Sequence, residues 1–421
     1  MSKKYDEWEK GGLVVLDKHS RAKHEVLRTY VERYLEILCR RYGMPSFKIT
    51  LVDGFAGGGL YEDDEPGSPL ILLQAVESTE AKINDSRDKK ISVDAHYYFI
   101  EKGEKTFSTL NGVLQKSRYK DKIGQTVFLK NGLFEDYVDT IINSVRKRNP
   151  RSGGRIIFFL DQTGYSQVNP KTVRYIREQL KDKHGNEHAE FIITISTDYF
   201  IDFINDKLPA FQKNIKDLGL EPYINSEEIL RIKKENPDNW KYIIEAKFSF
   251  AWQQATGASY IRPFFIEPEY THRGYWLLHL SPHPTAHDAM TDIHWEKGNY
   301  FRHYGGGLGF NIFGYKPQPN DNLNGTSFNE VFRQENEKCL MEEIPRRIWT
   351  SGDDGICVED FIDRYRNFKA VNNSIVKKTL LDSCKEHQIV ILGNKGGKKR
   401  NLNSLSKKDI ILPQRQKKFI F

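Results

Sequence analysis

Short apolar runs alternate with amphipathic segments over the first 300 residues of the chain. Residues 20–42 place their apolar side chains on one stripe, with charged side chains opposite, which predicts a helix. Apolar, β-branched runs that end in turn residues predict strands. These runs lie at residues 48–53, 96–100, 126–129, 155–160 and 191–195, with helices predicted at 66–76 and 170–180.

Two further predicted strands, 260–266 and 275–280, flank a polar turn and indicate a hairpin. A lysine-rich, helix-prone insertion precedes them at about residues 205–258. Strands that alternate with helices are typical of an α/β fold with a mostly parallel sheet. Residues 1–300 are therefore predicted to form a Rossmann-like, doubly wound sheet with an antiparallel edge hairpin.

The pattern changes after residue 300. Residues 301–326 are rich in Gly, Asn and Pro without a clear period, which predicts a linker or an extended arm. In residues 327–421, helices are predicted at 328–344, 358–365 and 373–387, followed by a hairpin of strands 389–392 and 410–412. This order of elements predicts a winged helix-turn-helix domain.

Charge is concentrated at the C-terminal end. The chain has 421 residues and a net charge of +7, but residues 385–421 alone hold ten Lys and Arg against two acidic residues. The rest of the chain is therefore close to neutral. A neutral body with a basic tail favours an anionic partner such as nucleic acid, although a solvated basic surface is the alternative.

The remaining composition indicates a cytoplasmic protein. The four cysteines are scattered without a C-x-x-C pair, which argues against a zinc or iron–sulfur site. No stretch approaches the roughly 20 apolar residues that span a bilayer. The N-terminal residues also lack an apolar signal core. We therefore expect no membrane association.

The strongest local signal is a glycine-dense turn after the strand at 48–53. Glycines turn sharply and let a ligand approach the backbone closely, and open α/β sheets build nucleotide sites on such turns. The spacing is not G-x-G-x-x-G and no Gly-Lys-Ser/Thr follows, which excludes a P-loop. A cofactor loop is predicted, with a purely structural turn as the alternative, at Asp53, Gly54, Phe55, Ala56, Gly57, Gly58 and Gly59.

Three acidic residues, Asp53, Glu101 and Asp161, follow three of the predicted strands. Each alone is more often a helix cap or a turn former. Because the carboxyl ends of parallel strands meet at one edge of a sheet, the three together favour a shared ligand. Glu101 is placed to accept hydrogen bonds from ribose hydroxyls. A nuclease that holds a divalent metal on these carboxylates is a less favoured alternative.

Several motifs between about residues 20 and 300 resemble those of a known family. They are the Asp-Gly-Phe-Ala-Gly segment at 53–57, Gly67-Ser68-Pro69, the segment Asp161-Gln162-Thr163-Gly164-Tyr165, the strand at 276–280 and Met290 with Trp295. The chain resembles S-adenosylmethionine-dependent methyltransferases, and more narrowly the three-Cys-motif partner proteins. The resemblance implies a role in bacterial or phage-related modification or defence, beside an iron–sulfur, radical-type three-Cys-motif protein.

The resemblance also implies roles for single residues. Asp53 and the glycine turn would face the methionine part of S-adenosylmethionine, and Glu101 the ribose. Asn131 or Phe134 would lie near the adenine, although residues 130–132 are equally consistent with a plain turn. Lys23 and His24 match the lysine-rich start of the family's first helix. There they would either gate the site or be ordinary exposed cations.

The acceptor side is predicted at Asp161, Gln162 and Tyr165. DNA amino-methyltransferases use an Asp/Asn-Pro-Pro-Tyr/Phe segment to hold and stack the base. This chain keeps the acid and the aromatic residue but has neither proline. Gln162 would substitute as an amide partner. A catalytic Asp161 and a merely structural acid at a strand end both remain open.

No metal site is expected. His279, His283, His287 and Asp288 are close in sequence, but Pro282 and Pro284 separate a strand from the helix beyond them. These four side chains therefore do not share a helical face, and their spacing does not enforce convergence on a metal.

In the C-terminal domain a basic helix and a basic hairpin tip predict phosphate contacts that do not depend on sequence. The candidates are Lys377, Lys378, Lys395, Lys398, Lys399 and Arg400. Many winged helices bind protein instead, so docking is the alternative. The two leading functions are thus a methyltransferase that acts on nucleic acid and a non-catalytic adaptor that brings a partner enzyme to nucleic acid.

Overall fold

The computed structural model divides the chain into two compact units, Met1–Ile293 and His294–Phe421. The structure describes residues 14–16, 18–41, 43–150, 154–162, 166–196, 204, 208–235, 240–266, 275–297, 301–302, 330–352, 354–366, 371–393, 396–399 and 405–414.

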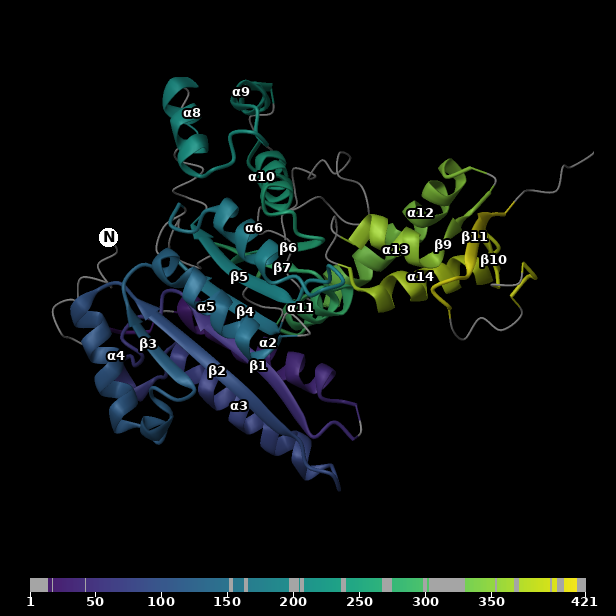
Figure 1. Ribbon diagram of the computed structural model, residues 1–421. Helices are drawn as coiled ribbons and strands as arrows, with labels where there is room; N and C mark the ends of the chain where they lie inside the picture. The colour runs from purple at the N-terminus through teal and green to yellow at the C-terminus, as the bar shows by residue number, and fades with distance from the viewer. Residues whose placement is uncertain are drawn as a thin grey trace, which may run out of the picture. The chain divides into compact units, whose positions relative to one another are not determined.

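The first unit is built on one sheet with the strand order β3-β2-β1-β4-β5-β7-β6 (Figure 1). β1 to β5 pair in parallel, and β7 runs antiparallel to both of its neighbours, β5 and β6. The bounds are β1 (Ser46–Asp53), β2 (Ser92–Glu101), β3 (Val127–Asn131), β4 (Arg155–Asp161), β5 (Ala189–Ser196), β6 (Tyr260–Ile266) and β7 (Tyr275–Ser281). The predicted doubly wound sheet with a hairpin is confirmed.

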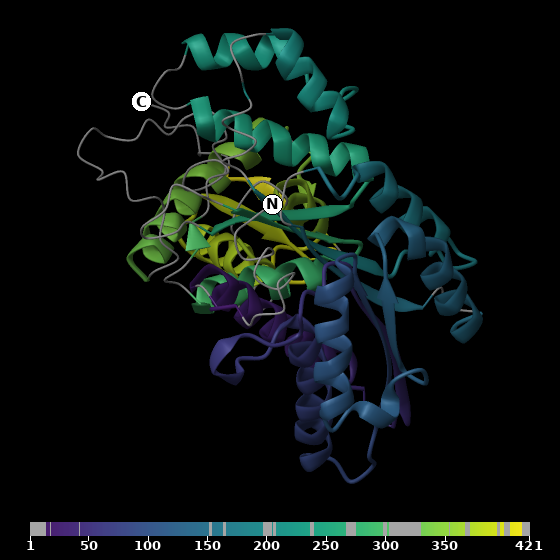
Figure 2. The same ribbon diagram turned by 90° about the vertical axis from the view of Figure 1, so that its left-hand side faces the viewer.

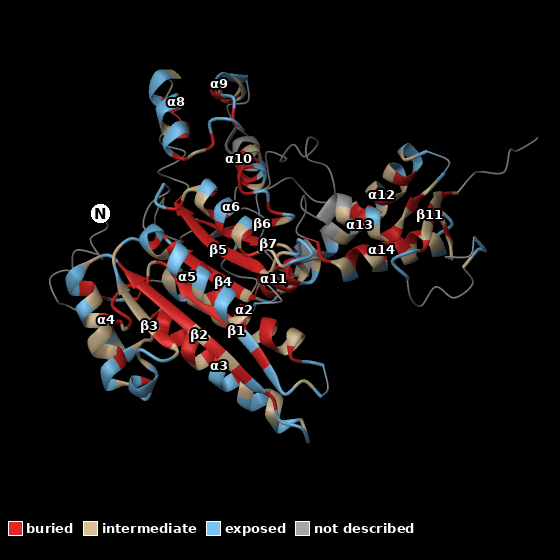
Figure 3. Cartoon of the chain, viewed as in Figure 1, coloured by how far each residue is buried: buried red, intermediate tan, exposed pale blue. Residues whose placement is uncertain are grey.

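The order of the strands fixes where the helices lie. The chain moves outward from β1 to β3 and then returns to β4, so right-handed crossovers place α3 and α4 on one face and α5 and α6 on the other. α2 packs on α3, and α5 packs on α6. Helices cover both faces of the sheet (Figure 2), and its strands are largely buried (Figure 3). The bounds are α2 (Lys18–Leu38), α3 (Ser68–Asp85), α4 (Glu104–Lys116), α5 (Phe134–Arg148) and α6 (Pro170–Gln179).

The pattern of apolar positions did not predict α4 or α5. α4 covers the outer strands β2 and β3 and buries only Thr106, Leu110 and Leu114, so its apolar stripe is narrow. The insertion predicted at about 205–258 contains α8 (Leu208–Asp217), α9 (Ser226–Glu235) and α10 (Trp240–Thr256). α10 packs against α6 and α9.

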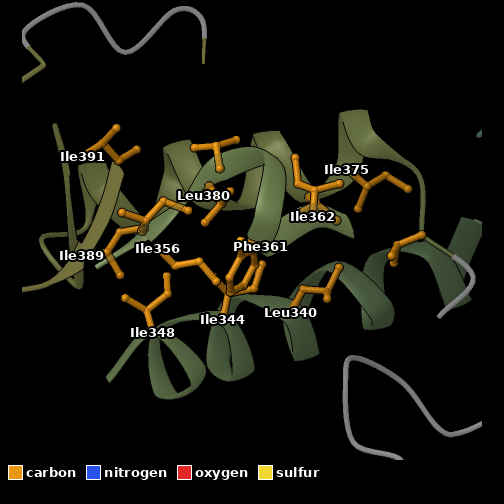
Figure 4. Packing of buried hydrophobic residues seen from close by; sticks show 14 residues of the cluster. Leu340, Ile344, Ile348, Ile356, Phe361, Ile362, Ile375, Leu380, Ile389 and Ile391 are labelled. Carbon is orange, nitrogen blue, oxygen red and sulfur yellow. The ribbon is translucent and has the colours of Figure 1, made fainter. Parts of the chain in front are cut away.

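The second unit has its own apolar core. α11 (Pro284–Lys297), within which the two units divide, is followed by β8 (Phe301–Arg302). The later elements are α12 (Glu330–Thr350), β9 (Ile356–Cys357), α13 (Val358–Arg366), α14 (Asn373–Lys385), β10 (Ile389–Leu392) and β11 (Ile410–Pro413). Leu340, Ile344 and Ile348 on α12 face Phe361 on α13 and Leu380 on α14 (Figure 4).

The strands of this unit form an antiparallel sheet in the order β10-β11-β9. The predicted order of three helices and a hairpin is present, and β9 is an added strand. The predicted arm at 301–326 lies outside the described residues beyond Arg302. Among the helices that the structure describes, none combines the length and apolar character needed to cross a bilayer.

Candidate functional site

The glycine turn after β1 is tied to both neighbouring strands. Gly54 N donates to Phe159 O at 2.9 Å on the β4 side, and Ala56 N donates to Ile100 O at 2.9 Å on the β2 side. Gly59 has φ +79°, and a Cβ there would lie 2.7 Å from Leu110 Cδ1. Phe55 is partly exposed, whereas the rest of the turn is buried. Only glycine fits where the backbone packs this closely.

The second motif closes on the first. Gly67 N donates to Gly59 O at 3.0 Å, and a Cβ on Gly67 would lie 3.0 Å from the carbonyl carbon of Gly59. Ser68 begins α3, with Pro69 in its first turn, where a missing N–H costs little. The Asp-Gly-Phe-Ala-Gly and Gly-Ser-Pro segments therefore form one structural unit at the carboxyl end of β1.

Asp53 is the buried acid of this unit and is 1% exposed. Its Oδ1 accepts a hydrogen bond from Phe55 N at 3.1 Å, while its buried Oδ2 has no hydrogen-bond partner in the described part of the chain. Burial raises the pKa of Asp53 to about 7, against the lowering effect of the Ser68 hydroxyl and the Phe55 N–H. The charges of Asp161 and Glu101 also raise this pKa, so the three acids lie within electrostatic range of one another.

Glu101 fastens the glycine turn, a role that the sequence did not predict. Its Oε2 accepts from Gly57 N at 3.0 Å and its Oε1 from Gly103 N at 2.7 Å. Asn131 Nδ2 donates to Glu101 O at 2.8 Å. Phe134 is buried, with its ring centroid 6.0 Å from that of Phe158. Asn131 therefore stabilises a turn, and Phe134 belongs to the core.

Asp161 is the most accessible of the three acids, with 45% of its side chain exposed. Lys23 Nζ on α2 donates to both carboxylate oxygens, at 2.7 and 2.6 Å, and lies 5.3 Å from the centroid of the Tyr275 ring. Burial acts to raise the pKa of Asp161, but the ion pair with Lys23 outweighs it, so the pKa is lowered. The first helix thus reaches the carboxyl end of β4.

Gln162 closes the loop that follows β4. It is 1% exposed, and its Oε1 accepts from Gln167 N at 2.8 Å and from Val168 N at 3.0 Å. Its buried Nε2 has no hydrogen-bond partner among the described residues. The side chain thus holds the loop in place. Tyr165, the predicted stacking residue, lies outside the described residues.

A buried polar cluster that the sequence did not predict anchors α2. Tyr30 donates from its hydroxyl to Glu190 on β5, and His279 Nε2 on β7 lies 2.9 Å from the same hydroxyl. Burial, with Glu190 beside it, raises the pKa of Tyr30. Tyr30 is seven residues after Lys23, or about two helical turns, so the cluster positions Lys23. No metal-binding group of His, Cys, Asp and Glu occurs in the described ranges.

Two surface hollows lie away from these acids. One, of about 400 Å³, is lined mainly by α6 and by Pro222 and Tyr223. The other, of about 320 Å³, is lined by the residues at the amino ends of β1 and β4. Neither of these two hollows is lined by Asp53, Glu101 or Asp161.

The predicted phosphate-binding residues of the second unit have mixed surroundings. Lys399 pairs with Asp409, and both side chains are largely buried, so Lys399 stabilises the sheet. Lys378 pairs with Glu337 at 2.6 Å but is 62% exposed, and such surface pairs exchange readily. No ion pair of Lys377 or Lys398 with a described residue is found. Lys395 and Arg400 lie outside the described residues.

Comparison with known proteins gives faint structural likenesses, among them the following two. No protein-family model matches the chain, and no curated protein matches it. A geranyl diphosphate methyltransferase in complex with GPP and sinefungin is 11% identical, with a TM-score of 0.24, over 60% of this chain and 78% of that one. A protein described as a possible exported protein from Bordetella parapertussis is 9% identical, with a TM-score of 0.25, over 61% and 67%. These scores are too low to support a conclusion about activity.

Proposed function

We propose that the carboxyl edge of the sheet binds S-adenosylmethionine and supports methyl transfer. The observation that carries this proposal is the glycine turn beside Asp53, whose buried Oδ2 has no described partner. The turn lies between β2 and β4, where the chain reverses its direction across the sheet. Doubly wound sheets bind ligands at this position. The motif resemblance supplies the identity of the cofactor.

The charges of the site suit a cationic cofactor. Because the pKa of Asp53 is about 7, its carboxyl group is partly protonated near neutral pH. A positively charged sulfonium or ammonium group beside it would favour the ionised form. Gly57, Gly58 and Gly59 would let the cofactor contact the backbone, and the carboxylate of Glu101 would accept hydrogen bonds from the ribose hydroxyls. Asp161 would hold the acceptor's N–H after Lys23 moves away.

We propose nucleic acid as the acceptor, in a modification or defence setting. The basic C-terminal residues support this, with Lys377 and Lys398 as the best-placed described cations. A winged helix remains the domain type that fits three helices and a hairpin. The defence setting follows from the family resemblance alone.

A second candidate is a non-catalytic adaptor for an iron–sulfur, radical-type partner. Two observations favour it, namely the ion pair that occupies both oxygens of Asp161 and the engagement of Gln162 in its own loop. In this case the first unit would act as a scaffold and the second unit would contact nucleic acid or the partner.

Calorimetric titration with S-adenosylmethionine tests cofactor binding. We expect saturable binding by the wild type, weaker binding by Asp53→Ala and unchanged binding by Lys89→Gln, an exposed control. The absence of heat at millimolar cofactor would contradict the proposal. Asp161→Asn then separates the two candidates: loss of labelled methyl transfer to DNA or RNA with cofactor binding intact indicates an enzyme.

A further inference from the structure

The hollow at the amino ends of the strands lies at the opposite edge of the sheet from the acidic residues. Its volume is about 320 Å³, within the range of small-molecule pockets. It is lined by Ser46, Phe47, Lys48, Asn149, Arg155 and His188. None of these residues belongs to the proposed cofactor site, so a ligand in this hollow would bind independently of that site.

The charged side chains that line this hollow are basic. Lys48 is exposed, with its Nζ 3.4 Å from Arg148 O, and Arg155 is partly exposed at the start of β4. His188 precedes β5, and the register of the sheet places it beside Arg155. This clustering stands out because the charge of the chain before residue 385 is close to neutral.

Of the nearby acidic groups, Asp182 contacts His188, whereas Glu190 and Asp94 are engaged by other residues. Asp182 Oδ2 lies 3.6 Å from His188 Nε2, but its Oδ1 accepts from His184 N and Asn186 N, both at 2.8 Å. Glu190 is buried and accepts from the hydroxyl of Tyr30. Asp94 pairs with Arg148 at 2.8 Å. None of these carboxylates lines the hollow.

The pKa of His188 responds to the charged groups around this hollow. Burial lowers the pKa of His188, and Arg155 lowers it further, against the opposing effects of Asp182 and Glu190. A bound anion would offset the charge of Arg155 and raise this pKa. The imidazole of His188 therefore serves as a reporter for a ligand in the hollow.

We propose that this hollow is a binding site for a small phosphate-class oxyanion, either phosphate or diphosphate. The guanidinium of Arg155 also interacts with the buried Tyr34, and its remaining N–H groups would donate to phosphate oxygens, whose geometry suits a planar guanidinium. Lys48 adds a second cation, and the hydroxyl of Ser46 adds a neutral donor. Phe47 borders the hollow with an apolar surface, as is usual for a site that takes an organic phosphate.

Calorimetry with inorganic phosphate and pyrophosphate at low ionic strength tests the proposal. We expect saturable binding of at least one anion, weakened about tenfold or more by Arg155→Gln and also weakened by Lys48→Gln. Lys105→Gln, which removes an exposed lysine at the start of α4, beyond the carboxyl end of β2, should bind like the wild type. If Arg155→Gln fails to fold, Lys48→Gln decides, because its exposed side chain is not part of the core.

Histidine NMR supplies a second readout on the same samples. The His188 resonance, assigned with His188→Gln, should titrate at a higher pH when pyrophosphate is bound. The absence of saturable binding would overturn the proposal. Binding that Lys48→Gln and Arg155→Gln leave unchanged, or that does not move the pKa of His188, would equally overturn it and would place the anion elsewhere.

Discussion

Asp53 illustrates how burial alone gives a carboxyl group unusual properties. Its side chain lies beneath the glycine turn, and its pKa of about 7 arises first from burial and then from the neighbouring acids. The ordinary pKa of an aspartate is about 3.9, so the native state binds a proton that the unfolded chain releases. Between these two values, rising pH therefore lowers the stability of the folded protein.

Replacement of Asp53 by Asn should stabilise the free protein at alkaline pH. The amide oxygen can still accept from Phe55 N, whereas the buried negative charge is lost. The gain in unfolding free energy at pH 8 should approach about 4 kcal/mol and fall toward zero near pH 4. Urea unfolding of both proteins at the two pH values measures it. A variant less stable than the wild type at pH 8 would show that Asp53 is not a strained, ionised group.

The Lys23–Asp161 pair should have the opposite effect to Asp53, because it makes the folded protein more stable as pH rises. The ion pair lowers the pKa of Asp161 against the partial desolvation of this half-exposed carboxylate, so the pair adds stability above the ordinary aspartate pKa, and this is lost as pH falls through the lowered value. In Lys23→Met, the pKa of Asp161 should rise above its wild-type value. Carboxyl ¹³C NMR can follow this titration, with Lys89→Met as the control. An unchanged pKa would mean that Lys23 does not hold Asp161 in solution.

At the residue scale, the sequence predicted three acids at one edge of the sheet but not the groups that hold each of them. Asp53, Glu101 and Asp161 each end a parallel strand, and the carboxyl ends of parallel strands lie along one edge of a sheet. The partners of Glu101 and Gln162 are backbone N–H groups of loops, and no side-chain pattern reveals those. Tyr30, Glu190 and His279 come from three separate elements, so their contact depends on the complete fold.

At the scale of elements, the glycine turn and α3 depend on each other. Strands and long helices were predictable because their apolar periods are regular. The contact between Gly59 and Gly67 was not predictable, since it joins two backbone segments at residues that have no side chains. α4 also escaped prediction because an edge helix buries few residues.

Replacement of Gly67 by Ala should weaken the turn. The new Cβ would lie 3.0 Å from backbone atoms of Gly59, which cannot move as a flexible side chain would. Overpacking of this kind costs about 1–3 kcal/mol of unfolding free energy, and it should also weaken S-adenosylmethionine binding. Thermal melts and calorimetric titration would measure the two effects.

Gly112→Ala is the matched control for this substitution. Gly112 lies in α4, and no atom lies within 4 Å of the position that a Cβ would take there, so alanine should stabilise the helix by about 1 kcal/mol. If Gly67→Ala lowered the unfolding free energy no more than Gly112→Ala, the two motifs would not approach each other this closely in solution.

For the whole molecule, the main feature is the presence of two units with separate cores. The change of pattern after residue 300 predicted a second domain, and contacts divide the chain at Ile293. Separate cores suggest that one unit can lose stability while the other keeps its ligand site. The assignment of the C-terminal lysines was less predictable, because Lys399 is engaged by Asp409, which lies 10 residues further along the chain.

Replacement of Phe361 by Ala should selectively destabilise the second unit. Phe361 is fully buried in that unit's core, and such truncations cost about 3–5 kcal/mol. Calorimetry should show one unfolding transition shifted down, with S-adenosylmethionine binding unchanged. Trp349→Ala, at an exposed aromatic residue, should shift neither transition much. A loss of cofactor binding in Phe361→Ala would contradict the independence of the two units.

A crystal structure of the protein grown with S-adenosylmethionine would show whether the cofactor binds at the glycine turn. We expect cofactor density along Gly57, Gly58 and Gly59, between Asp53 and Glu101, with Lys23 moved away from Asp161. Density at any other position, or an unchanged and closed turn at saturating cofactor, would contradict this expectation.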